Sequence, residues 1–291
     1  MIPISFLHDW STRAPWPDLR QVEQDLIISR ALCDLFNSPA LKGKIAFRGG
    51  TAIHKMLFEE PLRYSEDIDL VQIHGEPIGT TVDSIRDALS WLGPCRRSPA
   101  IHSMHLRFRF QPEAAPGTNL NLKVEINTRE HTPLYSIKDY PFSVKNGWYT
   151  ATTKIASYEP EELFGTKLRA SLQRRKNRDL FDLAVGMRRL GLDPDKLIAC
   201  FEHYLAVEGA KIGRADAEQT MLKKLNQSLT EDIAPLLPPQ VHFSDDDAIR
   251  AFGLVWNQLI ARITGDPWAG SDKAIEAIRK KKYPRLLDNG T

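Results

Sequence analysis

The most constraining part of the sequence is residues 45–71, IAFRGGTAIHKMLFEEPLRYSEDIDLV. A short apolar run ends at Gly-Gly-Thr, an amphipathic segment follows, and the stretch closes on Asp-Ile-Asp-Leu-Val. Because side chains alternate along a strand, Asp67 and Asp69 point to one side while Ile68 and Leu70 face a core. The pattern predicts a strand, a glycine-led helix and a second strand with two carboxylates on one face.

The glycine pair and the carboxylate pair both point to phosphate chemistry. Gly49 and Gly50 lack side chains, so backbone N–H groups at the start of the next helix can approach an anion. Asp67 and Asp69 lie about 6–7 Å apart along one strand face and repel each other unless a cation lies between them. Magnesium is the usual cation, since hard ions prefer carboxylate oxygens. The combination predicts phosphoryl or nucleotidyl transfer.

Each half of this pattern also has an ordinary structural explanation. A Gly-Gly pair is commonly a turn, and Asp-x-Asp is commonly a solvated strand edge. The order of the two halves, with a predicted helix between them, favours the enzyme interpretation.

Length and composition set the wider frame. A chain of 291 residues is longer than one compact core usually holds, which predicts two domains. The formal net charge of +2 does not by itself indicate a nucleic-acid partner. Cys33, Cys95 and Cys200 lie far apart, which argues against a zinc site or a disulfide scaffold. With no apparent signal peptide or apolar membrane-length run, we expect a cytoplasmic protein.

The hydrophobic periodicity predicts a mixed α/β part followed by a helical part, with a boundary near residue 155. Residues 1–16 are expected to form an irregular lead-in that packs on the body. The expected helices of the first part are 18–36, 51–58 and 81–92, and its expected strands are 45–48, 67–73, 105–111, 119–127, 142–144 and 148–150. The expected helices of the second part are 160–190, 194–207, 213–229, 245–265 and 270–281.

A third carboxylate, Glu125, lies on the strand 119–127, whose alternate positions are apolar. If this strand lies beside residues 67–73, Glu125 completes a cluster of three carboxylates with the two aspartates. The alternative is an exposed glutamate beside Lys123, and the pattern of this strand alone favours that alternative.

The segment 160–190 carries the second informative constellation. On a continuous helix, one stripe holds Lys167, Ser171, Arg174, Arg178 and Asp182. Such a stripe suits the neutralisation of a triphosphate, with Asp179 and Asp182 holding the cations by pairing one turn apart. A solvated, charged helix face is the alternative. Residues 279–282, RKKK, are either a phosphate contact or a solvated tail.

Three stretches resemble the AbiEii/AbiGii-type nucleotidyltransferase toxins, the MenT-like toxins of type IV toxin–antitoxin systems. FRGGTAIHKML and RYSEDIDLV are similar to the first family motif, F-K-G-G-T-x-L followed by R-F-S-x-D-I-D-L. VEQDLIISRAL resembles the lead-in helix, and LKVEI resembles the central carboxylate strand. KLRASLQRRKNRDLFDL resembles the later motif K-x-x-A…R-x-R-D-x-x-D-L. The resemblance covers residues 20–190.

The resemblance implies a DNA-polymerase-β-like nucleotidyltransferase domain with a mixed sheet, residues 1–155, and a helical C-terminal domain, residues 156–291. Two magnesium ions would be bound by Asp67, Asp69 and Glu125. Lys167 and Asp182 would be essential positions of the later motif. The nucleoside triphosphate would be bound by Gly49, Gly50, Thr51, Ser65, Lys167, Arg174 and Arg178.

The family further implies transfer of a nucleoside monophosphate to an RNA acceptor such as tRNA. It also implies a role in a toxin–antitoxin or phage-defence system and a separate antitoxin protein. Two departures stand out: Arg48 replaces the commoner lysine, and the later motif reads RRKNRD rather than a tighter R-x-R-D. Two rival functions remain, an enzyme that modifies small molecules and a non-catalytic nucleotide- or RNA-binding module.

Overall fold

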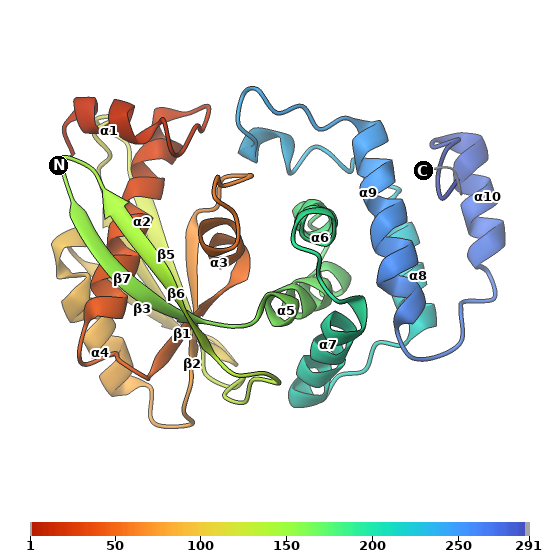
Figure 1. The fold of residues 1–291 in the computed structure, drawn as a ribbon, viewed down its shortest axis with the longest axis horizontal. Coiled ribbons are helices and arrows are strands. Elements are labelled where there is room, and N and C mark those ends of the chain that lie inside the picture. The colour runs from red at the N-terminus through yellow and green to blue at the C-terminus, as the bar shows by residue number, and fades with distance from the viewer. Residues whose placement is uncertain (1, 289–291) are drawn as a thin grey trace. The chain divides into compact units, whose positions relative to one another are not determined.

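A computed structural model describes residues 2–288 of the protein (Figure 1). The chain forms two compact units, each with its own core. The first unit extends to Glu159 and includes Leu236–Gln240, and the second comprises Pro160–Pro235 and the residues from Val241 onward. The short segment 236–240 joins the first unit through the Tyr64 N–H, which donates to the Leu236 carbonyl at 2.7 Å.

The first unit is built on one seven-stranded sheet with the strand order β3-β4-β5-β2-β1-β7-β6. The pairs β2–β5 and β1–β7 are parallel and the other neighbours are antiparallel, so the sheet is mixed and the predicted α/β fold class is confirmed. The strands are β1 Ile45–Arg48, β2 Asp67–Gln72, β3 Cys95–Pro99, β4 Ser103–Phe110, β5 Leu120–Asn127, β6 Lys138–Lys145 and β7 Thr150–Ser157.

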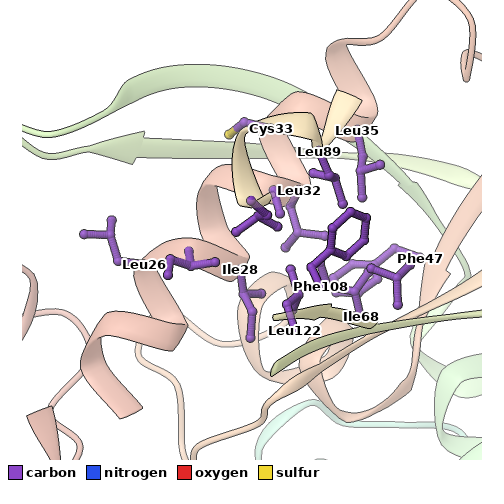
Figure 2. Packing of buried hydrophobic residues seen from close by; sticks show 14 of the residues in the cluster. Leu26, Ile28, Leu32, Cys33, Leu35, Phe47, Ile68, Leu89, Phe108 and Leu122 are labelled. Atoms are coloured by element: carbon purple, nitrogen blue, oxygen red, sulfur yellow. The ribbon is translucent and has the colours of Figure 1, made fainter. Parts of the chain in front are cut away.

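Helices of the first unit cover the sheet and form its core. They are α1 Ile4–Trp10, α2 Leu19–Asn37, α3 Gly49–Met56 and α4 Gly79–Ala88, with a short 3-10 turn at Ser90–Leu92. Helix α2 begins at a capping box between Asp18 and Gln21, in which the Asp18 backbone N–H donates to Gln21 Oε1 at 3.4 Å, and the Asp18 carboxylate also accepts the backbone N–H of Arg20 at 2.9 Å. Figure 2 shows its apolar face packed on residues of the strands and of the segment after α4: Leu26, Ile28, Leu32 and Leu35 with Phe47, Ile68, Leu89, Phe108 and Leu122. The opposite side of β2 is therefore left for polar side chains.

The second unit is helical, and glycines allow its helices to pack closely. A β-carbon on Gly165 would lie 2.6 Å from the Cys200 β-carbon of α7, and one on Gly186 would lie 2.3 Å from the Phe164 ring. The helices are α5 Pro160–Gln173, α6 Arg178–Arg189, α7 Pro194–Glu208, α8 Arg214–Lys224, α9 Asp245–Gln258 and α10 Ser271–Lys281, with a short 3-10 turn at Ile260–Arg262. A further 3-10 turn, Ala234–Leu236, lies where the chain passes from the second unit to the segment 236–240 of the first. No helix in the described part of the chain has the length and apolar character needed to cross a membrane.

Several predicted elements differ from the structure. Residues 4–10 of the predicted irregular lead-in form α1, which buries Leu7 and Trp10. Strand β3 was not predicted, because it is an edge strand whose side chains are mostly exposed and show no apolar alternation. Strands β6 and β7 are longer than expected, since they pair with each other along their whole length.

The predicted continuous helix 160–190 is also wrong. The chain leaves the helix after Gln173 and starts α6 at Arg178. The break is stabilised from a distant part of the sequence, because the Asp232 carboxylate accepts the backbone N–H of Asn177 at 2.7 Å and that of Arg178 at 3.3 Å. Lys167 and Arg178 therefore belong to different helices, and the single charged stripe does not exist.

Candidate active site

The register of β2 and β5 brings the three predicted carboxylates onto one face of the sheet. Asp69 lies directly beside Glu125, and Asp67 lies beside Lys123 on the same parallel pair. The alternate residue Ile68 is fully buried against the helices, so the carboxylates occupy the opposite face. Glu125 is thus next to Asp69, and its strand lies beside β2, as the first of the two alternatives supposes.

Glu125 is held by two basic side chains. The Lys123 Nζ donates to Glu125 Oε2 at 2.6 Å, and the His105 Nε2 of β4 lies 3.4 Å from the same oxygen. Burial raises the pKa of Glu125, but the hydrogen bond and charge of Lys123 outweigh this effect and lower it overall. Glu125 therefore lies beside Asp69 in register and also pairs with Lys123.

The ammonium of Lys123 lies among several negative charges. Burial disfavours the charged form, but the hydrogen bond to Glu125 and the charges of Glu125, Asp67 and Asp69 outweigh it and raise the pKa of Lys123. A resident cation thus offsets part of the repulsion between the carboxylates.

The donor set suits a hard divalent cation, although its oxygens are not gathered at one point. Asp67, Asp69 and Glu125 supply carboxylates in register on neighbouring strands, which is the chemistry that magnesium prefers. Among residues 2–288, no three His, Cys, Asp or Glu side chains converge closely enough to hold a metal ion.

The glycine-led helix starts beside the aspartates. Helix α3 begins at Gly49 rather than at Thr51 as predicted, and Gly49 has φ +81°. A β-carbon on residue 49 would lie 2.0 Å from Asp69 Oδ2, so the glycine leaves room for the carboxylate at the start of the helix. The positive end of the α3 dipole favours a negative charge at this position.

Thr51 and Ser65 connect α3 to the entrance of β2. The Thr51 hydroxyl lies 2.5 Å from the Asp67 carbonyl and 2.8 Å from the Ser65 hydroxyl. Both residues are predicted nucleotide ligands, and in this structure their hydroxyls contact each other. Their proximity fixes the start of β2, and with it Asp67, against the first turn of α3.

In the second unit, Lys167 lies in a buried ion network between α5 and α6. Its Nζ is 3.2 Å from Asp179 Oδ1 and 3.0 Å from Asp182 Oδ2, and all three residues are buried. Arg174 donates two hydrogen bonds to the Asp179 carboxylate, both at 2.6 Å. Burial raises the pKa of Asp179, but the charge of Lys167 and the hydrogen bond from Arg174 outweigh it and lower the pKa.

Arg178, the other predicted cation, lies at the first position of α6 and is half-buried. Its backbone N–H bonds to Asp232, as described above. The structure thus brings Lys167, Arg174 and Asp182 into one network and places Arg178 beside it at the helix start.

The comparison with protein families decides the classification. The sequence pattern of the family described as nucleotidyl transferase AbiEii toxin, type IV TA system, matches residues 30–258, which is most of the 291-residue chain. The chain belongs to the AbiEii nucleotidyltransferase toxin family. The match extends beyond the resemblance seen at residues 20–190 and reaches the end of α9.

Solved structures are similar to this AbiEii family member over most of its length. MenT4, a nucleotidyltransferase toxin from Mycobacterium tuberculosis H37Rv, has the same fold, with a TM-score of 0.62 and 14% identity over 99% of this chain and 98% of that chain. JHP933 from Helicobacter pylori has a TM-score of 0.49 and 16% identity, over 90% and 97% of the two chains. A putative nucleotidyltransferase from H. pylori has a TM-score of 0.49 and 16% identity, over 84% and 99%. No curated protein sequence matches the chain.

Several residues that pack around these carboxylates were missed from the sequence. Gln24 of α2 donates to the carbonyls of Glu66 at 3.1 Å and Asn121 at 3.2 Å, so it ties together the starts of β2 and β5. Lys55 of α3 contacts Asp25 at 3.0 Å. Their signal was the run Glu-Gln-Asp at residues 23–25, which places polar groups at buried positions of α2.

Arg48 and Glu130 form a second support that was missed. Arg48 is paired in register with Asp69 and forms an ion pair with Glu130, and both side chains are largely buried. Burial lowers the pKa of Arg48, but Glu130 and other negative groups, Asp69 among them, outweigh it and raise the pKa. A charged residue at the end of an otherwise apolar strand was the available signal.

Proposed function

We propose that the protein is a magnesium-dependent toxin that transfers a nucleoside monophosphate from a nucleoside triphosphate to an RNA acceptor, with tRNA as the acceptor class. It would act in the cytoplasm, within a type IV toxin–antitoxin or phage-defence system, and a separate antitoxin protein would restrain it. The observation that carries the proposal is the register that places Asp67, Asp69 and Glu125 on one sheet face, beside the glycine-led start of α3.

Asp67, Asp69 and Glu125 would together hold the two magnesium ions. When bound, such ions lower the pKa of an attacking hydroxyl and offset charge on the leaving phosphates. Glu125 would exchange its contact with Lys123 for this role. His105 and Lys123 would keep the carboxylate charged and oriented in the meantime.

Other residues of the chain would bind and orient the nucleotide. The backbone N–H groups at Gly49 and Gly50 would receive phosphate oxygens at the α3 N-terminus, with the Thr51 and Ser65 hydroxyls beside them. Lys167, Arg174 and Arg178 would offset triphosphate charge, and Asp182 would position the Lys167 ammonium at its present 3.0 Å contact. Catalysis would rest on positioning and charge neutralisation.

The test is incubation of the purified chain with magnesium and each labelled nucleoside triphosphate, with total tRNA or with small hydroxylated compounds as acceptors. We expect magnesium-dependent pyrophosphate release and label in the RNA. Asp67→Asn and Asp69→Asn are each expected to reduce the rate by roughly 10²–10³-fold or more. Asp139→Asn, which removes an exposed carboxylate from β6 of the same sheet, is the matched control.

Each alternative has a distinct outcome in this assay. Label found only in small acceptors would replace the RNA acceptor with a small-molecule substrate. Binding of nucleotide without pyrophosphate release would indicate a non-catalytic binding module. Full activity of Asp67→Asn or Asp69→Asn would remove the metal assignment.

A further inference from the structure

A pocket in the second unit lies where α5 and α8 both end. It has a volume of about 350 Å³ and is lined by Leu172, Gln173, Arg174, Arg175, Thr220, Lys223, Lys224 and Gln227. The two helix ends are joined by Lys224, whose Nζ donates to the carbonyls of Arg174 at 2.8 Å and Lys176 at 3.3 Å. The pocket is therefore built from a fixed helix junction.

The lining of this pocket is positively charged. Four of its eight described lining residues are Lys or Arg, and none of the eight is acidic. Arg174 is held by Asp179 on α6, and Lys224 is buried against the carbonyls. Burial lowers the pKa of Lys224, and this effect outweighs the charges of the neighbouring Asp179 and Asp232.

Two of the four cations are available to a ligand. Arg175 and Lys223 are exposed, and within residues 2–288 neither side chain forms a hydrogen bond or an ion pair. Like charges gathered around one hollow repel each other, and an anion bound there relieves this repulsion. The chemistry of the lining thus fits phosphate, for which Arg offers planar paired donors and Lys a point charge.

A second hollow continues from the first, and two hydrogen-bond acceptors in its lining lack a donor. It has a volume of about 540 Å³, shares Arg175 and Gln227 with the first, and is also lined by Asn177, Ser228, Glu231 and Asp232. Among the described residues, Asn177 Oδ1 and Asp232 Oδ1 are buried acceptors without a partner. A ribonucleotide supplies both requirements, phosphate oxygens for the cations and 2′-hydroxyl donors for these acceptors.

We propose that these two adjoining pockets bind the sugar–phosphate backbone of RNA, the acceptor in the transfer proposed above, on which this inference rests. Arg175 and Lys223 contact phosphate oxygens, and Arg174 and Lys224 supply the fixed positive surroundings. The phosphate groups of a nucleoside triphosphate have the same chemistry, so the experiment separates the two sources.

The test is binding of a fluorescein-labelled single-stranded RNA to the full chain, measured by anisotropy over a range of NaCl concentrations without nucleotide. The double variant Arg175→Gln/Lys223→Gln is expected to weaken binding roughly tenfold and to reduce the salt slope by about 1.4, because each lost contact with single-stranded RNA contributes about 0.7. Lys176→Gln/Lys211→Gln removes the same charge from exposed residues outside both pockets and is the matched control. DNA of the same sequence is expected to bind more weakly than RNA.

Four results would overturn the proposal. The first is an equal loss of RNA affinity in the two double variants. The second is full RNA affinity in Arg175→Gln/Lys223→Gln, which is the result expected if the site binds an acidic protein segment instead of RNA. The third is a raised KM for the nucleoside triphosphate with RNA binding unchanged, which would assign the pocket to the nucleotide. The fourth is equal affinity for RNA and DNA.

The proposed transfer reaction is tested independently of this pocket. RNA binding is also measured in the double variant Asp67→Asn/Asp69→Asn, whose substituted residues do not line the pocket. Binding that persists in this variant and falls in Arg175→Gln/Lys223→Gln supports the pocket even where no transfer is detected. A failed transfer assay alone therefore counts against the proposed function and not against the pocket.

Discussion

The carboxylate of Asp69 lies against the backbone of Gly49, at a distance that no other residue at position 49 permits. A β-carbon there would be 2.0 Å from Asp69 Oδ2, and the backbone has φ +81°. The glycine therefore serves two purposes, a left-handed backbone conformation and close approach of an acid to the start of α3. This contact makes the glycine pair and the Asp-x-Asp pair one structural unit rather than two separate motifs.

Replacement of Gly49 by alanine is expected to displace Asp69 and to reduce both stability and transfer. Left-handed backbone costs a non-glycine residue about 1–2 kcal/mol, and the clash with the carboxylate adds to this cost. Urea unfolding and pyrophosphate release measure the two effects. Gly43→Ala is the matched control, since Gly43 has φ +72° and a β-carbon added there would meet no neighbouring group within 4 Å.

The comparison separates the clash from the backbone strain. Gly43→Ala should lose only the stability that the left-handed backbone costs a non-glycine residue, and it should keep full transfer activity. If Gly49→Ala were no less stable than Gly43→Ala and equally active, the close contact between Asp69 and the glycine would have no consequence.

The sequence predicted the first unit well where local patterns carry the information. Alternation of apolar residues marked β2, β4 and β5, and the glycine pair marked the start of α3, because these signals depend on near neighbours in the chain. The pairing of β2 with β5 was only a hypothesis, since register between strands more than 50 residues apart depends on the whole sheet. The contact of Glu125 with His105 depends on the antiparallel register of β4 and β5 and was not predicted.

The second unit shows why a charge pattern on one helix was misleading. The sequence from Glu161 to Leu190 has helical periodicity throughout, yet the helix breaks after Gln173. The group that stabilises the break, Asp232, lies 55 residues beyond Asn177 and has no local signature. The pairing of Lys167 with Asp182 survives the break only because α5 and α6 pack against each other.

Lys123 is expected to compete with metal ions for Glu125. Its Nζ is 2.6 Å from the glutamate, so Lys123→Gln should free the carboxylate and increase apparent magnesium affinity roughly two- to fivefold, the range of a half-exposed ion pair. The measurement is the magnesium dependence of the Tm, with a non-hydrolysable nucleoside triphosphate present.

Arg107→Gln is the control for this competition. Arg107 is exposed on β4 and is paired in register with Lys123, but it does not contact Glu125. Arg107→Gln removes one positive charge from this face of the sheet, as Lys123→Gln does. An equal shift of the magnesium dependence in both variants would show that Lys123 acts only as a distant charge.

Lys167 is expected to be required for the stability of the second unit. Lys167→Met leaves Asp179 and Asp182 buried without their shared cation, and loss of one member of a buried ion pair typically costs about 3–5 kcal/mol. Urea unfolding followed by tryptophan fluorescence measures this, with the exposed Lys211→Met as control. Unchanged stability with lost transfer would instead assign Lys167 to the nucleotide alone.

Asp179 is expected to make the second unit sensitive to acid. Its pKa in the folded chain is lowered from 3.8, because Lys167 and Arg174 outweigh the effect of burial. As the pH falls, the unfolded chain therefore takes up the proton first, so the contribution of this carboxylate is fully present above about pH 4–5 and is lost below that value. The urea midpoint of the second unit should fall steeply as the pH drops below this range.

Asp179→Asn separates this carboxylate from the general effect of acid. The variant should be less stable than the wild type at neutral pH, because Lys167 and Arg174 lose a charged partner, and its midpoint should fall less steeply below about pH 4. Asp266→Asn removes an exposed carboxylate of the same unit and should follow the wild-type curve. Parallel acid curves for wild type and Asp179→Asn would mean that groups other than Asp179 carry the acid sensitivity.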